Sequence, residues 1–406
     1  ARIEDGSIPI VTSRAFAPLQ ARRDFYRFLI ETERAYWTGI DTYLKRELKV
    51  KAPVSGTQLG YSLPHLQAEL DYVDDHSYWC HPSPVNKDWR IRNEPMVNSL
   101  ACILGLATRR VQGKPYTVSE YNHPFPNQYG AEGQPLLRAY GALQGWDGVF
   151  EYTYNHSPDF EPRRNTYFFS MIARTDVLAH FPACAAMYLR GDVREAQGHV
   201  VGSLDKTSWF DRLVKQKAVS FSIDSCGIDA KYALVHKVAM GFPEAPAEAA
   251  PRPAAPAWGD VIVSDTGELT WNRERPGKAY WTVDTPNTKL FSGFPDGREV
   301  ALGGVRLAVG ETRLGWATVS LTSRHATGFG GDGRSADILL AATGLSENKG
   351  MAISKVNDRE ITLTDWGQGE TQVEGIPAVV TLPSDTAKTA CYALDPAGNR
   401  KASVPV

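Results

Sequence analysis

The stretch Lys114-Pro-Tyr-Thr-Val-Ser-Glu-Tyr-Asn-His-Pro124 contains a short apolar strand that ends in a group of polar side chains. Residues 116–118 form the strand, and Glu120 follows almost directly. A carboxylate at the end of a buried strand needs a partner or a chemical task, because its desolvation alone costs several kcal/mol. At the mouth of an α/β barrel that task is usually catalysis. We therefore interpret Glu120 as a candidate catalytic carboxylate, with a salt-bridged structural glutamate as the alternative.

Strands and helices alternate on both sides of this stretch. Hydrophobic periodicity predicts strands near residues 54–61, 72–79, 116–121 and 148–154, and helices over 22–47, 96–110, 131–143 and 175–189. This alternation is typical of parallel βαβ units, and four such units make half of an eight-unit barrel. The alternative is an open doubly wound sheet, which is less favoured because no glycine-rich phosphate loop follows any of the strands.

The pattern changes in the second half of the chain. Residues 243–257 are rich in proline and alanine and predict a stiff, extended connector. Beyond them, short strands separated by Gly, Asp and Asn turns predict a β-sandwich. We therefore expect an α/β plus all-β fold: the second half of a (β/α)8 barrel over 1–190, a connecting region over 191–258, and a β-sandwich over 259–406. The sandwich strands are expected at 261–263, 269–271, 279–283, 289–291, 300–307, 316–321, 338–343, 361–363 and 378–382.

A second strand, Asp71-Tyr-Val-Asp-Asp-His-Ser-Tyr-Trp79, carries ionisable groups near its carboxyl end. Alternation places Asp74, His76 and Tyr78 on one face. A tyrosine there can donate its hydroxyl to the Glu120 carboxylate, and a histidine can contact either a substrate or that carboxylate. Two alternatives remain: Asp74 and His76 satisfy each other inside a core, or they bind a metal together with His81. The spacing of the second alternative matches no familiar metal site.

Composition excludes several classes of function. The formal net charge of −2 argues against a nucleic-acid partner, and no apolar run approaches the length of a membrane span. The five cysteines are scattered and have no CxxC spacing, so neither a disulfide framework nor a zinc site is expected. We expect no metal and no cofactor. The chain starts at Ala1 without a recognisable signal peptide, and we expect a processed product or a fragment.

Three segments together resemble a known group of enzymes. Asp75-His-Ser-Tyr-Trp79, Ser119-Glu-Tyr-Asn122 and the run 146–155 are similar to the second half of a barrel from the clan of retaining (β/α)8 glycoside hydrolases. This clan includes cellulases, β-mannanases and β-galactosidases. The carboxy-terminal portion is similar to the β-sandwich appended to large bacterial members. The matching segments there are Ser264-Asp-Thr-Gly-Glu-Leu-Thr-Trp271, Thr282-Val-Asp-Thr-Pro286, Ile338-Leu-Leu-Ala-Ala-Thr-Gly344 and Glu347-Asn348.

The resemblance implies a retaining glycoside hydrolase that acts on β-linked polysaccharide, with a cellulose-like β-glucan favoured. It implies that Glu120 is the nucleophile and that Tyr78 supports it. The remaining candidate substrate contacts are His76, Trp79, Asn122, His123 and Tyr154. Polysaccharide substrates further imply a secreted or periplasmic protein.

The same resemblance implies an acid/base carboxylate in an Asn-Glu pair, on the fourth strand of the barrel. Asn93-Glu94-Pro95 contains such an Asn-Glu pair. However, only one βα unit separates Glu94 from Glu120, whereas three units separate the two catalytic carboxylates in the clan. We interpret Glu94 as a carboxylate at the start of a helix. The acid/base is then expected upstream of this chain, in a missing N-terminal half of the barrel. The alternative function is a non-catalytic carbohydrate-binding or scaffold protein with a degenerate half barrel.

Overall fold

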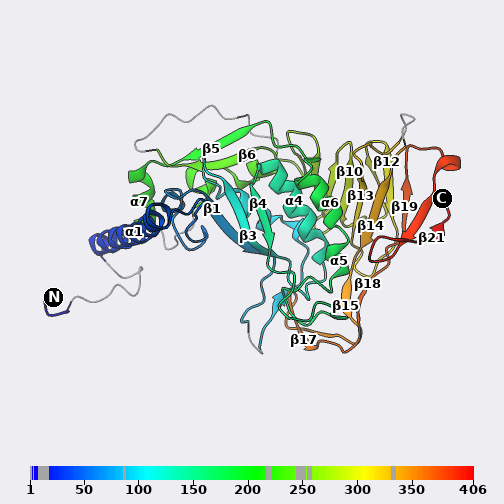
Figure 1. The fold of residues 1–406 in the computed structure, drawn as a ribbon, viewed down its shortest axis with the longest axis horizontal. Helices are drawn as coiled ribbons and strands as arrows, with labels where there is room; N and C mark the ends of the chain where they lie inside the picture. The colour runs from blue at the N-terminus through cyan, green and yellow to red at the C-terminus, as the bar shows by residue number, and fades with distance from the viewer. Residues whose placement is uncertain are drawn as a thin grey trace.

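The computed structural model describes residues 2, 4–7, 18–85, 88–215, 221–243, 253, 258–330 and 335–406. The molecule is elongated, with helix α1 (Leu19–Thr42) near one end and the hairpin β20 (Cys391–Leu394) and β21 (Arg400–Val404) at the other (Figure 1). Parallel strands, a helical layer and antiparallel sheets follow one another along the long axis. Apart from residues 243 and 253, the predicted connector 243–257 lies outside the described residues.

Three strands form a parallel sheet in the order β1-β3-β4, with β1 at Val73–Tyr78, β3 at Tyr116–Asn122 and β4 at Gly148–Glu151. The connections contain α3 (Ala101–Ala107) and α4 (Gly133–Gln144). The prediction of consecutive parallel βαβ units is confirmed for these three strands. The strand predicted over 54–61 is wrong: this segment has no regular structure, although its Leu59 amide donates to the Asp74 carbonyl at 2.8 Å.

A β-bulge interrupts the register between β1 and β3. Asp75 pairs with Val118, and the next residue, His76, pairs with Glu120, so that Ser119 is the extra residue. A bulge of this kind lets two successive side chains of one strand face a single residue of its neighbour. It therefore brings both Ser119 and Glu120 to His76, which simple alternation does not allow.

The remaining helices surround this sheet. The predicted helix over 22–47 is confirmed as α1 and a π-helical turn, Tyr43–Glu47. The helix predicted over 96–110 starts late, because Leu100 adopts a left-handed conformation (φ 52°) just before α3. The other helices are α2 (Pro64–Gln67), α5 (Thr175–Leu178), α6 (Phe181–Tyr188) and α7 (Lys206–Lys215), with 3-10 turns at Met96–Asn98, Gly130–Glu132, Ile223–Cys226, Ala230–Leu234 and Thr386–Lys388.

Residues 191–242 belong to the α/β part. Strands β5 (His199–Ser203) and β6 (Lys237–Gly241) pair in parallel. The Met240 amide donates to the Arg110 carbonyl at 2.7 Å, and Val111 forms a parallel bridge with Met240. These contacts join the pair to the segment that leads into β3.

A six-stranded antiparallel sheet, in the order β14-β13-β10-β9-β8-β7, forms the centre of the second half. A three-stranded sheet, β11-β12-β19, packs against it across a core that includes Phe291, Leu307 and Val319. The prediction of short antiparallel strands is confirmed, with two exceptions: the segment 300–307 is a hairpin rather than one strand, and the strand predicted at 361–363 belongs to neither of these two sheets. The strands are β7 (Val261–Val263), β8 (Leu269–Asn272), β9 (Tyr280–Asp284), β10 (Thr288–Gly293), β11 (Glu299–Leu302), β12 (Val305–Val309), β13 (Ala317–Ser323), β14 (Ile338–Thr343) and β19 (Ala378–Thr381).

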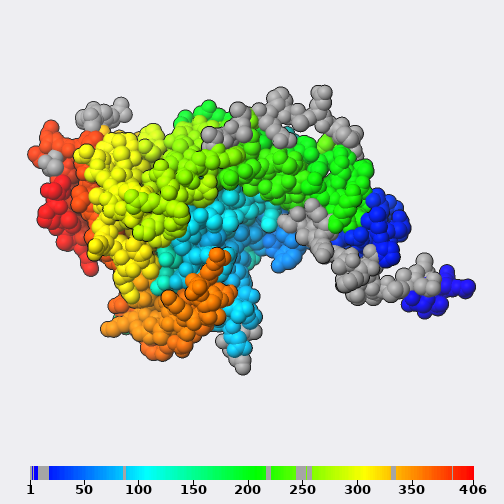
Figure 2. Space-filling model, turned by 180° about the vertical axis from the view of Figure 1, so that it is seen from behind, coloured from blue at the N-terminus to red at the C-terminus, as the bar shows by residue number. Residues whose placement is uncertain are grey.

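The two halves of the chain interlock. Strands β16 (Ala352–Lys355) and β17 (Glu360–Asp365) form a sheet with β2 (Ile91–Arg92), and β15 (Ser346–Asn348) pairs with β18 (Thr371–Val373). Figure 2 shows this late segment, in orange, lying beside the early segment drawn in cyan. The buried Trp271 donates to the Val97 carbonyl at 2.6 Å, and Trp281 packs against Tyr140. The α/β part and the six-stranded sheet therefore share one hydrophobic core.

Candidate functional site

Glu120 lies on β3, the central strand of the parallel sheet, and its side chain is 26 % exposed. His76 of β1 faces it, with Nδ1 3.2 Å from Glu120 Oε2. The other ring nitrogen of His76, Nε2, lies 2.8 Å from Ser119 Oγ and 3.3 Å from Asp74 Oδ2. One imidazole thus sits between two carboxylates, and Glu120 Oε1 accepts no hydrogen bond from the part of the chain that the structure describes.

Asp74 is held by donors from the neighbouring strand. Its carboxylate accepts hydrogen bonds from Thr117 Oγ1 (2.5 Å), the Ser119 amide (3.0 Å) and Ser119 Oγ (2.6 Å). Burial tends to raise the pKa of Asp74, but the hydrogen bonds from His76, Ser119 and Thr117 outweigh it, and the pKa is lowered. Asp74 is therefore a fixed negative charge beneath His76.

The pKa of His76 is shifted in the opposite direction, above its ordinary value. Burial tends to lower the pKa of His76, but the hydrogen bond to Asp74 and the negative charges of Glu120 and Asp74 raise it above its ordinary value. The imidazole therefore carries a positive charge up to a higher pH than an ordinary histidine. A cation at this place holds the Glu120 side chain in one orientation.

The opposite face of the sheet serves packing. Asp75 is fully buried and pairs with Arg109 at 3.1 Å, and burial raises the pKa of Asp75 to about 6 despite this partner. Glu151 of β4 pairs with Arg138 of α4. The face with Asp74, His76 and Ser119 is the open one, and Phe150 beside it is 56 % exposed.

Aromatic rings continue the site beyond the strand ends. Tyr78 packs against Tyr152, Phe169 and His81, with ring centroids 6.4, 5.1 and 4.9 Å apart. Tyr154, two residues after Tyr152 in the chain, is 52 % exposed. Among the described residues Tyr78 donates no hydrogen bond to Glu120, which the sequence led us to expect. Its ring instead belongs to the aromatic group that it forms with Tyr152, Phe169 and His81.

Three predicted substrate contacts lie in the interior. Trp79 is 4 % exposed and donates from Nε1 to the Glu94 carbonyl at 2.8 Å. Asn122 is 2 % exposed, and its side chain donates from Nδ2 to the carbonyls of Tyr152 and Phe169.

His123 is also 2 % exposed, and its Nε2 lies 2.8 Å from Asn127 Oδ1. Burial lowers the pKa of His123 to about 3. As a correction, we treat Trp79, Asn122 and His123 as positioning residues, because none of them offers surface to a sugar. Of the remaining predicted contacts, His76, Tyr78 and Tyr154 reach the open side.

Sequence reasoning missed Ser119, Tyr152 and Glu132. The position of Ser119 depends on the bulge, and that of Tyr152 depends on the path of the chain after β4. Neither feature has a local signal in the sequence. Glu132 is fully buried and accepts hydrogen bonds from the amides of Met96 and Val97. It takes the helix-start role that we expected for Glu94, which instead pairs with Arg92 at 2.8 Å. Burial raises the pKa of Glu132 to about 8, against the effect of the two amides.

Within the described ranges, no group of three or more His, Cys, Asp or Glu side chains is arranged to hold a metal ion. The ring of His81, considered above with Asp74 and His76, turns toward Tyr78 and places Nδ1 2.7 Å from the Pro82 carbonyl. No helix in that part of the chain is both long and apolar enough to cross a bilayer. Comparisons with models of protein families, with curated proteins and with solved structures return no match to this chain.

Proposed function

We propose that this chain carries the nucleophile half of a retaining glycoside hydrolase for β-linked polysaccharide, with Glu120 as the nucleophile. The observation that supports this most is the pairing of a partly exposed Glu120 with His76 on the adjacent parallel strand. Oε2 is held by the imidazole, and Oε1 is left to attack an anomeric carbon. Near the carboxyl ends of β1 and β4, the rings of Tyr78 and Tyr152 lie with their centroids 6.4 Å apart and offer surfaces that suit the flat face of a sugar.

The open face of the sheet supports the half-barrel part of the proposal. In a closed barrel, one face of every strand points inward and is covered by the opposite strands. Here Ser119 and Phe150 are exposed on that face, while the other face is covered by helices α3 and α4. We therefore propose that β1, β3 and β4 are neighbouring strands of such a barrel and that further strands complete it.

In the proposed reaction, Glu120 bonds to the anomeric carbon as the bond to the leaving oxygen breaks. A second carboxyl group, about 5–5.5 Å away, protonates that oxygen and later activates water. Asp74 does not fit this role, because its lowered pKa and its three hydrogen bonds keep it ionised. The proposal assigns the acid/base to the segment that completes the barrel.

One other reaction class has a specific observation in its favour. His76 Nε2 lies 2.8 Å from Ser119 Oγ, and Nδ1 faces Glu120, which is the order of a Ser-His-Glu acyl hydrolase. Two features weigh against it. Ser119 Oγ donates to Asp74 rather than to the ring, and a histidine of raised pKa is a poor general base near neutral pH. The Ser119 amide is also engaged with Asp74, so it cannot stabilise an oxyanion.

A mechanism-based label tests the nucleophile without requiring the acid/base. A 2-deoxy-2-fluoro β-glycoside with a dinitrophenolate leaving group needs no protonation of that group, so Glu120 alone suffices to form the glycosyl-enzyme. We expect the label on peptide 114–124, at Glu120, with β-glucosyl and β-mannosyl reagents compared in parallel. A label elsewhere, or no label with either reagent, would overturn the proposal and favour carbohydrate binding without hydrolysis.

Two variants serve as a matched pair in this assay. Glu120→Gln keeps the size of the side chain and should lower the labelling rate by at least about a thousand-fold, as expected for a group that acts in the transition state. Ser119→Ala removes the neighbouring hydroxyl and should retain labelling within about tenfold. The reverse result would place the glycosyl bond on Ser119 and overturn the assignment of Glu120 as the nucleophile.

A further inference from the structure

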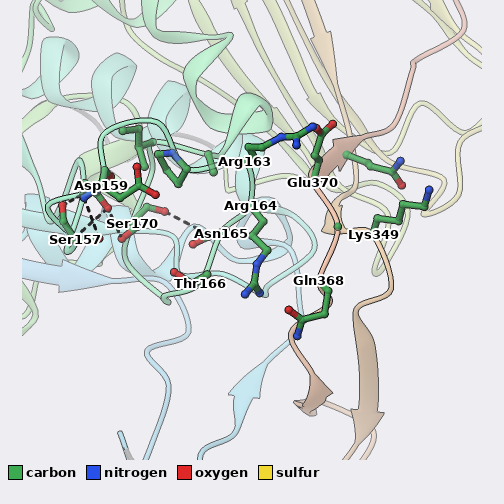
Figure 3. Close-up of a pocket in the computed structure, with 16 residues that line it drawn as sticks. Ser157, Asp159, Arg163, Arg164, Asn165, Thr166, Ser170, Lys349, Gln368 and Glu370 are labelled. Atoms are coloured by element: carbon green, nitrogen blue, oxygen red, sulfur yellow. Dashed lines mark hydrogen bonds and ion pairs between the residues drawn. The ribbon is translucent and has the colours of Figure 1, made fainter.

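A polar pocket lies at the outer end of the loop that follows β4. It has a volume of about 680 Å³, within the range of about 300–1,000 Å³ typical of small-ligand sites. One wall comes from residues 155–173 and the other from residue 349 and residues 368–372 (Figure 3). The pocket begins at Asn155, which follows the exposed Tyr154 directly in the chain.

The two walls are fixed to each other by hydrogen bonds through the backbone. The Asn165 amide donates to Asn348 Oδ1 (3.1 Å) and to Thr371 Oγ1 (3.0 Å), and Asn348 Nδ2 donates to the Asn165 carbonyl (2.6 Å). The Thr371 amide donates to the Arg163 carbonyl at 2.9 Å. Because segments about two hundred positions apart are joined so closely, the pocket is preformed and a ligand would not have to order it.

The pocket lining has three cationic side chains, Arg163, Arg164 and Lys349, against two acidic ones, Asp159 and Glu370, which leaves an excess of one positive charge. Arg163 pairs with Glu370, but Arg164 and Lys349 make no ion pair with an acidic side chain in the described ranges. Arg164 instead donates from one nitrogen to the Gly367 carbonyl at 2.6 Å, which fixes its guanidinium at the pocket wall. In Figure 3 the Arg164 side chain extends toward the end of the pocket where Gln368 lies.

The other lining groups suit a sugar ring. Thr166, Gln368 and Gln372 offer hydroxyl and amide groups for hydrogen bonds to sugar hydroxyls. Pro162 and Ile172 offer small apolar surfaces for the face of a ring. A guanidinium held by one nitrogen still presents further donors in a planar fork, which matches the two oxygens of a carboxylate.

We propose that this pocket binds an anionic sugar residue, bearing a carboxylate or a sulfate ester, of the polysaccharide that reaches Glu120. Arg164 and Lys349 bind the anionic group, and the amide and hydroxyl groups bind the ring. The inference rests on the proposed function and narrows the substrate to acidic or acid-decorated chains.

Equilibrium binding tests this assignment apart from catalysis. Titration calorimetry on the Glu120→Gln chain compares three tetrasaccharides: a galacturonate, a sulfated galactan and neutral cellotetraose. We expect at least one anionic ligand to bind at least tenfold more tightly than cellotetraose, and to lose affinity as salt is raised. The ratio of the affinities for the two anionic ligands identifies whether the pocket prefers a carboxylate or a sulfate ester.

The charge variants locate the binding. Arg164→Gln and Lys349→Gln should each weaken the anionic ligand at least fivefold, and the double variant should remove its advantage over cellotetraose. Lys401→Gln, an exposed lysine of the terminal hairpin, is the matched control and should change nothing. Equal affinities for anionic and neutral ligands, no binding of any ligand, or an unaffected double variant would overturn the inference.

Failure of this inference and failure of the proposed function give different results. If the fluorosugar does not label Glu120 but the anionic ligand binds through Arg164, the pocket stands as a carbohydrate-binding site and the hydrolase proposal falls. If the fluorosugar labels Glu120 and the double variant binds the anionic ligand as before, the hydrolase proposal is supported and the proposed anionic site is wrong.

Discussion

Two histidines in this molecule bridge neighbouring strands and differ in what surrounds them. His76 lies on the open face of the parallel sheet, with its side chain 25 % exposed, between Asp74, Ser119 and Glu120. His180 is fully buried between α5 and α6, where Nδ1 lies 2.9 Å from Ser320 Oγ and Nε2 lies 2.8 Å from Thr343 Oγ1. The first ring faces carboxylates and the second faces only hydroxyls.

This difference separates a charged site from a structural contact. Burial lowers the pKa of His180 to about 4, so its ring is neutral at physiological pH and joins the helical layer to β13 and β14. Carboxylates raise the pKa of His76, so its partly exposed ring keeps its proton to a higher pH than an ordinary histidine does. The hydroxyls of β13 and β14 thus contact a neutral ring in the interior, whereas Asp74 and Glu120 contact a ring that is partly exposed.

The largest expected effect is on stability at His180. His180→Ala leaves a cavity and removes the partner of the Ser320 hydroxyl, while Thr343 Oγ1 still donates to the Asp176 carbonyl, and we expect it to lower the free energy of unfolding by about 2–4 kcal/mol. Urea denaturation followed by tryptophan fluorescence measures this loss. His76→Ala is the matched control and should cost no more than about 1 kcal/mol, because its ion pairs are partly solvated. Equal losses in the two variants would contradict the distinction.

The pH dependence of stability should differ in sign between the two histidines. The pKa of His180 is about 4 in the folded state and about 6.5 when unfolded. The unfolded chain therefore binds the proton more tightly, so the stability from the neutral ring is present above pH 6.5 and is lost as the pH falls toward 4. Relative to His180→Gln, wild-type stability should fall over that interval with a slope of at most about 1.4 kcal/mol per pH unit.

At His76 the pH dependence of stability should have the opposite sign. Its pKa is higher in the folded state than in the unfolded state, so its stabilising effect is complete below about pH 6.5 and is lost as the pH rises through the folded value. The difference in unfolding free energy between wild type and His76→Gln, measured from pH 5 to 9, should therefore shrink at alkaline pH. A difference that grows with pH would show that the imidazole is neutral in the folded protein.

The sequence predicted individual elements well, because period and turn residues are local signals. The strands at 261–263 and 338–343 have the predicted bounds, and alternation along 71–79 correctly separated Asp74 and His76 from the buried Asp75. The strand predicted over 54–61 failed because an apolar run becomes a strand only where a neighbour offers a complete edge. Here Leu59 makes a single backbone bond to β1.

The site was harder to predict than the elements, for a physical reason. Glu120 and His76 stand out as polar groups near strand ends, but the extra residue of the bulge, which brings Ser119 beside them, depends on register between strands. The burial of His123 depends on Asn127 and on the helical layer, which no local pattern of residues describes. Likewise, the return of β17 to β2 could not be read from composition.

The smallest expected effect on stability is at Tyr154. This ring is 52 % exposed, so Tyr154→Ala should change the free energy of unfolding by no more than about 0.5 kcal/mol. If the ring stacks on a sugar, its loss should weaken oligosaccharide binding by about tenfold, which corresponds to about 1.4 kcal/mol. Phe160→Ala, on another exposed ring of the same loop, is the control and should leave binding unchanged. Equal binding losses for both would mean that the loop contacts saccharide broadly, without a defined path from Glu120 to the anionic pocket.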